Sequence, residues 1–139
     1  MQRILCIAAV LATMPGLIRA QDFTSAAEIK PILEATRNSW VAVREFDGRD
    51  LVYFTHLLAW RCGITEIRYG LNGAAAETLL PMEPCYEAEA VPNALKSDSG
   101  VEIYLNEALG SVQSVAVRLR MDDGSELAAD YPRAAVLMP

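Results

Sequence analysis

Histidine and lysine are almost missing from this chain of 139 residues. His56 is the only histidine, and lysine occurs only at Lys30 and Lys96. Any histidine-dependent reaction therefore has to use His56, and a histidine that is hydrogen-bonded in the core or at a sheet edge is the ordinary alternative. The chain carries 12 basic against 18 acidic residues. This acidic balance disfavours nucleic acid and anionic lipid as partners.

The familiar catalytic and metal-binding motifs are missing as well. The chain contains no G-x-S-x-G, no C-x-x-C and no D-x-[DN]-x-[DN]-G calcium loop. Three glutamates, Glu83, Glu87 and Glu89, lie close together, but a run of one charge on a loop is usually solvated. We therefore expect no catalytic residues, no cofactor and no metal site, and an enzyme is the last of the readings that we retain.

One long apolar run is present, at the N-terminus. Ile4 to Leu17 follow Arg3 and precede the small residue Ala20. This order is typical of a secretory signal, and the run is too short to cross a hydrocarbon core of about 30 Å. We expect residues 1–20 to be a cleaved signal peptide and residues 21–139 to form one periplasmic or secreted domain without stable membrane insertion.

Cysteine usage agrees with export. Cys6 lies in the predicted signal, which leaves Cys62 and Cys85 in the mature chain. An even pair in an oxidising compartment predicts one disulfide, worth about 3 kcal/mol for a loop of this size. Reactive thiols are the alternative, but neither cysteine has an adjacent His or Lys to lower its pKa.

The mature chain begins with a helical pattern over residues 22–39. Ser25-x-x-Glu28 fits a capping box, and apolar residues recur at helical spacing. Pro31 opposes one unbroken helix because it lacks an amide hydrogen. We therefore expect a short helix that starts close to Pro31, or a kinked one.

A β-hairpin is predicted next. Trp40 to Phe46 is rich in strand formers, Asp47-Gly48 suits a tight turn, and a second apolar run starts at Leu51. A two-residue turn places Val43 opposite Val52 on one apolar face. The same register places Glu45 opposite Asp50, which is unfavourable unless both carboxylates reach solvent.

Residues 51–62 permit two interpretations. We favour a strand, because a turn and β-branched and aromatic residues precede it, and His56 would then share a face with Phe54 and Trp60. A helix capped by Asp50 and ended by Gly63 is the alternative, since short apolar runs do not settle the choice.

Turn signals at Asn72-Gly73 and Asp123-Gly124 separate further strands, and residues 74–100 look irregular and tethered by Cys85. The remaining alternating runs predict strands at 64–69, 101–105, 115–121, 127–131 and 134–137. This pattern predicts a mainly β fold, an antiparallel β-sandwich-like domain with a short N-terminal helix after the signal peptide.

Six polar or aromatic residues are candidates for a partner or ligand surface. Arg61 and Arg68 would seat a carboxylate if they converge, although salt bridges explain them equally well. Tyr104 lies on the polar side of its strand, as Arg118 and Arg120 do on theirs, which fits a partner surface. The complete set is His56, Arg61, Arg68, Tyr104, Arg118 and Arg120.

These observations favour a small, non-catalytic binding or assembly-accessory protein of the bacterial envelope. Such a protein would expose an aromatic patch near Tyr104 or an open sheet edge to a protein partner. A small-ligand carrier with a pocket at His56 and Arg61 is the first alternative. An inhibitor of a secreted hydrolase, using the 74–100 segment as a rigid loop, is the second.

Overall fold

The computed structural model describes residue 16 and residues 21–139. The predicted signal peptide, apart from Gly16, and its cleavage site therefore lie outside the described residues. The regular elements, in chain order, are α1 (Ala26–Ala35), the 3-10 helix η1 (Arg37–Ser39), β1 (Ala42–Phe46), β2 (Arg49–Tyr53), α2 (Thr55–Leu58), the 3-10 helix η2 (Arg61–Gly63), β3 (Ile64–Leu71), β4 (Thr78–Leu79), β5 (Tyr104–Ala108), β6 (Ser114–Met121), β7 (Glu126–Pro132) and α3 (Arg133–Val136).

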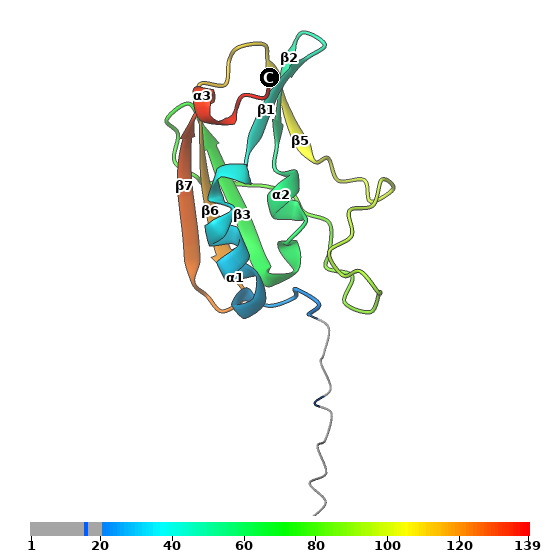
Figure 1. The fold of residues 1–139 in the computed structure, drawn as a ribbon. Coiled ribbons are helices and arrows are strands. Elements are labelled where there is room, and N and C mark those ends of the chain that lie inside the picture. The colour runs from blue at the N-terminus through cyan, green and yellow to red at the C-terminus, as the bar shows by residue number, and fades with distance from the viewer. Residues whose placement is uncertain (1–15, 17–20) are drawn as a thin grey trace, which may run out of the picture.

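The strands form two antiparallel sheets, which confirms the prediction of a mainly β fold (Figure 1). The first sheet has the order β1-β2-β5, and the second has the order β4-β3-β6-β7. One continuous core joins inward side chains of both sheets, among them Val43 and Val52 of the first and Ile67 and Leu119 of the second. The finer prediction of a sandwich-like packing of the two sheets stays a prediction.

Helix α1 lies across the four-stranded sheet and buries Ile29 and Leu33 against it (Figure 1). The expectation that the helix starts close to Pro31 is wrong, because it begins at Ala26 and continues through the proline. A proline inside a helix costs about 3 kcal/mol, and each buried Ile or Leu side chain returns about 1.5–3 kcal/mol. Burial of the apolar face therefore outweighs the lost hydrogen bond.

The predicted capping box is formed only in part. The Glu28 carboxylate accepts hydrogen bonds from the Ser25 hydroxyl and from the amide of Phe23, both at 2.9 Å. These bonds, the one from Ser25 first, hold the pKa of Glu28 below its usual value. The carboxylate thus holds the chain that leads into the helix, whereas the Ser25 side chain caps no backbone amide.

The β1–β2 hairpin has the predicted register. Val43 pairs with Val52, and Asp47 and Gly48 take the positive φ angles of 50° and 69° that a two-residue turn of this hand needs. Glu45 is indeed opposite Asp50. A side chain from the C-terminal region compensates this pair of carboxylates, and no local sequence pattern predicts that contact.

The strand interpretation of residues 51–62 is wrong beyond Tyr53. There β2 ends, and α2 and η2 follow. Leu57 and Leu58 are both buried. Successive residues of a strand point to opposite faces, so a strand would expose one of these leucines, whereas a helical turn buries both.

Two further strand predictions need correction. The strand expected at 101–105 begins only at Tyr104, because β2 ends at Tyr53 and offers residues 101 and 102 no partner. The final strand expected at 134–137 is the short helix α3, and a single parallel bridge between Val43 and Leu137 follows it. Arg133, the first residue of α3, forms ion pairs with Glu45 and Asp50 of the hairpin.

Residues 74–100 contain only the two-residue strand β4, which pairs with β3, so the predicted irregularity is largely confirmed. The disulfide between Cys62 and Cys85 is present, with a Cα–Cα distance of 5.0 Å. The expectation that Cys62 lies in a strand is wrong, because it belongs to η2. Among the described residues, the helices are all too short or too polar to cross a membrane.

Candidate functional site

The six candidate residues do not form one site, because the fold places them in three regions. The Arg61 side chain, from η2, is enclosed by the irregular segment. His56 of α2 borders the three-stranded sheet, and Tyr104 belongs to β5 of that sheet. The other three arginines lie on the outward face of the four-stranded sheet: Arg68, Arg118 and Arg120.

Arg61 organises the irregular segment and has no donor left for a ligand. The residue is 2% exposed, and all three guanidinium nitrogens donate hydrogen bonds to backbone carbonyls. Burial lowers the pKa of Arg61 from its usual value. The accepting carbonyls belong to Leu58, Glu83, Pro84, Asn93 and Ala94.

Glu83 completes this structural centre. It is 5% exposed, so our expectation of a solvated acidic run is wrong at this position. Its carboxylate accepts the Tyr86 hydroxyl at 2.9 Å and the Lys96 amide at 3.0 Å, and lies 3.7 Å from Arg61. A buried carboxylate needs such partners. Arg61 and Glu83 therefore give a segment with little regular structure a fixed conformation.

Two of the three arginines of the four-stranded sheet, Arg68 and Arg120, form ordinary surface ion pairs. Arg68 donates to Glu66 at 2.9 Å, and Arg120 lies 3.5 Å from Glu126. The hydrogen bond from Arg68 is the main reason that the pKa of Glu66 is lowered. Arg68 pairs across the strands with Arg118 and does not converge with the buried Arg61. This face is therefore largely neutralised.

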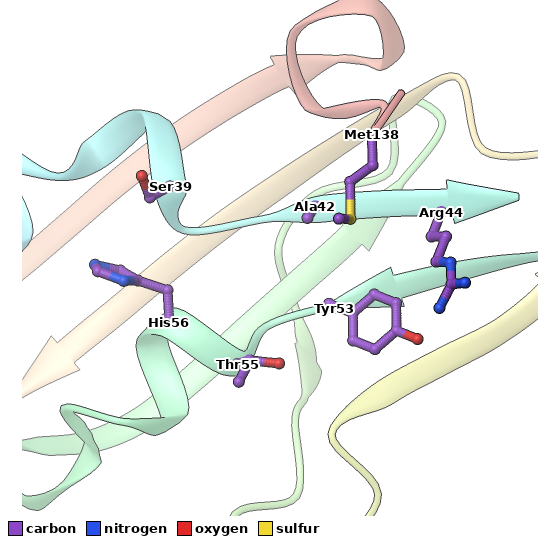
Figure 2. Close-up of a pocket in the computed structure, with 7 residues that line it drawn as sticks. All are labelled: Ser39, Ala42, Arg44, Tyr53, Thr55, His56 and Met138. Atoms are coloured by element: carbon purple, nitrogen blue, oxygen red, sulfur yellow. The ribbon is translucent and has the colours of Figure 1, made fainter.

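His56 borders an open hollow of about 420 Å³ (Figure 2). Its Nε2 lies 2.8 Å from the hydroxyl of Thr36, which itself donates to the carbonyl of Ile32. A hydroxyl has one proton to give, so His56 must donate through Nε2. Burial lowers the pKa of His56, which favours the neutral ring. These contacts fix the orientation of the ring and commit its Nε2 proton to Thr36.

Arg44 and Tyr53 lie at the other end of this hollow from His56 (Figure 2). Both residues also line a second hollow of about 260 Å³, which reaches Tyr104. The hollows are neighbours because residues alternate along β1 and β2: Val43 and Val52 point into the core, and Arg44 and Tyr53 point outward.

We call this outward surface of the three-stranded sheet the aromatic–arginine face. It consists of Arg44, Phe46, Arg49, Tyr53 and Tyr104. The Arg44 guanidinium stacks over the Phe46 ring at 4.4 Å, and the rings of Tyr53 and Tyr104 are 5.4 Å apart. Phe46 is nevertheless 52% exposed, so stacking leaves much of its apolar ring in water.

The arginines of this face lack acidic partners. Within the described part of the chain, neither Arg44 nor Arg49 has a carboxylate at ion-pair distance, in contrast to Arg68 and Arg133. Asp47 lines the second hollow but forms no ion pair with either. An acidic protein thus presents a local positive surface that is lined with aromatic rings.

Of the residues of this face, Tyr104 is the one that the sequence marks as a candidate. Alternation along Trp40–Phe46 was a usable signal, because it places Arg44 and Phe46 opposite the apolar Val43. No local signal joins Tyr104 to Tyr53, whose pairing depends on the β2–β5 contact.

Neither a metal-binding group nor a similar known protein helps to assign a role to this surface. Among residues 21–139, no group of three or more His, Cys, Asp or Glu side chains is placed to hold a metal ion. Comparisons with known protein families, curated proteins and solved structures find no match for this chain.

Proposed function

We propose that this chain is an exported, non-catalytic binding protein of the bacterial envelope, and that the aromatic–arginine face holds a protein partner. One observation carries the proposal: Arg44 and Tyr53 belong to both hollows, so the face is continuous. Aromatic residues and arginine are enriched in protein interfaces, and the core of an interface is desolvated on binding. The exposed ring of Phe46 is suited to such burial.

Export is supported by the disulfide between Cys62 and Cys85, because such bonds persist in oxidising compartments. The leader-like pattern of residues 1–20 supports the same location. We also infer a sandwich-like packing of the two sheets, since both contribute to one core. That packing leaves the opposite face of the three-stranded sheet available to a partner.

A small-ligand carrier is the second candidate. The hollow beside His56 has a volume typical of small-molecule sites. Hydroxyl groups of Ser39, Tyr53 and Thr55 lie around an apolar wall that includes Met138 (Figure 2). A few polar groups on an apolar wall are the usual composition of such a site.

Site-specific crosslinking in the envelope tests the leading proposal. A photoreactive amino acid at Phe46 should give a discrete adduct with a partner, and the same group at Leu79 should not. Leu79 is a matched control, because it is 53% exposed but lies on the four-stranded sheet. Arg44→Glu should weaken the adduct at Phe46. Equal labelling from both positions, or labelling from neither, would contradict the proposal.

Thermal melting tests the carrier. If a small ligand fills the hollow, a low-molecular-weight extract of the periplasm should raise the melting temperature of the oxidised protein. Ala42→Trp should abolish that shift, because residue 42 lines the hollow. Phe46→Ser, outside this hollow, should leave the shift intact. A shift that survives Ala42→Trp would argue against this pocket.

A further inference from the structure

We propose that the partner binds by adding an extended strand to the free edge of β5, with an acidic side chain that engages Arg49. This inference rests on the proposed function and names the chemistry of its partner. An exposed strand edge accepts main-chain hydrogen bonds from an incoming strand, and side chains on both faces then set the specificity.

The edge position of β5 follows from the sheet order, in which β2 is its only neighbour among residues 21–139. The amide of Phe54 donates to the carbonyl of Ile103 at 3.4 Å, so residues 103, 105 and 107 bond toward β2. The backbone groups of Tyr104 and Asn106 therefore point away from the sheet. They are the groups that an added strand would pair with.

The opposite edge of the same sheet is already covered. The amide of Met138 donates to the Val43 carbonyl at 2.8 Å, and Leu137 forms a parallel bridge with Val43. The C-terminal residues thus occupy the outer edge of β1. The long edge strand of the other sheet, β7, has its Ala128 carbonyl bonded by the Arg37 side chain.

The side chains beside the β5 edge are incompletely covered. Ile103 and Leu105 pack against the core but are only partly buried. A hollow of about 450 Å³ lies at the start of β5, lined by Leu95, Val101 and Tyr104 among others. Inward apolar residues of an added strand would complete the cover over Leu105, which gives the incoming segment an apolar inner face.

Arg49 determines the charge that the incoming segment should carry. Its Nε donates to Asn106 Oδ1 at 2.7 Å, and its Nη2 donates to the Asn106 carbonyl at 3.3 Å. That carbonyl is one of the outward groups an incoming strand needs. A charged side chain in such a position protects the edge of a sheet from pairing with unwanted strands.

An acidic residue on the outward side of the incoming strand would release this block. Its carboxylate would accept charge-assisted hydrogen bonds from the Arg49 guanidinium, and the Asn106 carbonyl would then be free for the ladder. Arg49 has no carboxylate partner of its own in the described residues. A neutral or basic strand offers no such exchange, so the edge should select acidic extended segments.

The test uses fluorescent, end-blocked nonapeptides of alternating valine and glutamate, or valine and lysine, titrated against the oxidised mature protein. The Val-Glu peptide should bind at least about tenfold more tightly than the Val-Lys peptide. Asn106→Pro should weaken Val-Glu binding by at least about tenfold, because it removes an outward amide. Proline at an edge position whose amide faces solvent is compatible with a strand.

Asp130→Pro is the matched control. The pairing of Met121 with Ser125 makes the backbone of Asp130 face the outer edge of β7 by the same alternation. This variant should bind the Val-Glu peptide like the wild type. Arg49→Glu, checked for an unchanged melting curve, should reverse the preference toward Val-Lys.

Failure of the inference is distinguishable from failure of the proposed function. No Val-Glu binding, equal losses in the Asn106→Pro and Asp130→Pro variants, or an unchanged preference in Arg49→Glu would overturn strand addition. Crosslinking from Phe46 would still stand in those cases and would keep the face as a partner surface. If neither the crosslink from Phe46 nor binding of the Val-Glu peptide is observed, both the inference and the proposed function are overturned.

Discussion

Arg133 binds both carboxylate oxygens of Asp50, a residue 83 positions earlier in the chain. Its Nη1 lies 2.6 Å from Oδ2, and its Nη2 lies 3.1 Å from Oδ1. Asp50 is fully buried, at 0% exposure, and also accepts the amides of Gly110 and Val112. The same guanidinium reaches Glu45 at 2.7 Å. Arg133 therefore compensates the charge of the Glu45–Asp50 pair, in which only Glu45 reaches solvent.

Removing Arg133 should destabilise the fold strongly. Arg133→Ala leaves the buried carboxylate of Asp50 without its cation, and losses of about 3–5 kcal/mol are typical of such changes. Urea unfolding of the oxidised protein measures the difference. Arg120→Ala is the control, because its ion pairs are exposed and should be worth about 1 kcal/mol or less. Similar losses in both variants would contradict a special role for Arg133.

Asp50 should make the protein sensitive to acid. The hydrogen bond from Arg133, aided by the amides of Gly110 and Val112, lowers the pKa of Asp50 from 3.8 to about 2. The folded state thus binds fewer protons than the unfolded state, so this stabilisation is complete above pH 4 and is lost as the pH falls toward 2. Asp50→Asn lacks this group and should show a shallower loss of unfolding free energy in urea titrations at pH 5, 4, 3 and 2. Parallel pH profiles for the two proteins would argue against the assignment.

Replacing Arg61 should release the irregular segment. Arg61→Met keeps a long apolar stem but leaves the carbonyls around it without donors, and each buried unpaired group costs about 1–3 kcal/mol. Amide exchange and limited proteolysis should report opening of residues 83–94, with β6 and β7 still protected. Asn93→Ala is a milder variant that removes the bonds to Cys62 and Phe23 and should loosen the same region. Arg68→Met, on the surface, should change neither readout.

Reduction of the disulfide should lower the melting temperature. Opening the loop between Cys62 and Cys85 should cost about 3 kcal/mol. The Cys62→Ser/Cys85→Ser double variant should melt near the reduced wild type and should not respond to dithiothreitol. A wild-type melting temperature that is indifferent to reductant would show that Arg61 and Glu83 hold the segment unaided.

Local sequence patterns predicted the features that depend on interactions between residues close together in the chain. The β1–β2 hairpin and its register follow from alternation and from a turn that accepts positive φ at Asp47 and Gly48. β6 and β7 follow from alternation as well. The Cys62–Cys85 bridge follows from pairing the two cysteines left after the signal.

Two of the failures share one cause, which is burial by distant residues. Leu57 and Leu58 suit a strand or a helix until the core demands that both be inside. Arg61 resembles a ligand-binding arginine until the carbonyls of residues 83–94 surround it. The amino-acid composition does not predict which of several arginines becomes buried.

The sequence by itself determined the β-rich character, the hairpin and the pairing of the cysteines. The first two depend on residues that are neighbours in the chain, and each cysteine has only one other cysteine to pair with once the signal is removed. Only the tertiary structure decided that Arg133 neutralises Asp50 and that Tyr104 joins Tyr53 beside Arg44 and Arg49. Those contacts join residues far apart in sequence. The Arg133–Asp50 pair in particular is strengthened because the site excludes water, which requires the whole fold to be in place.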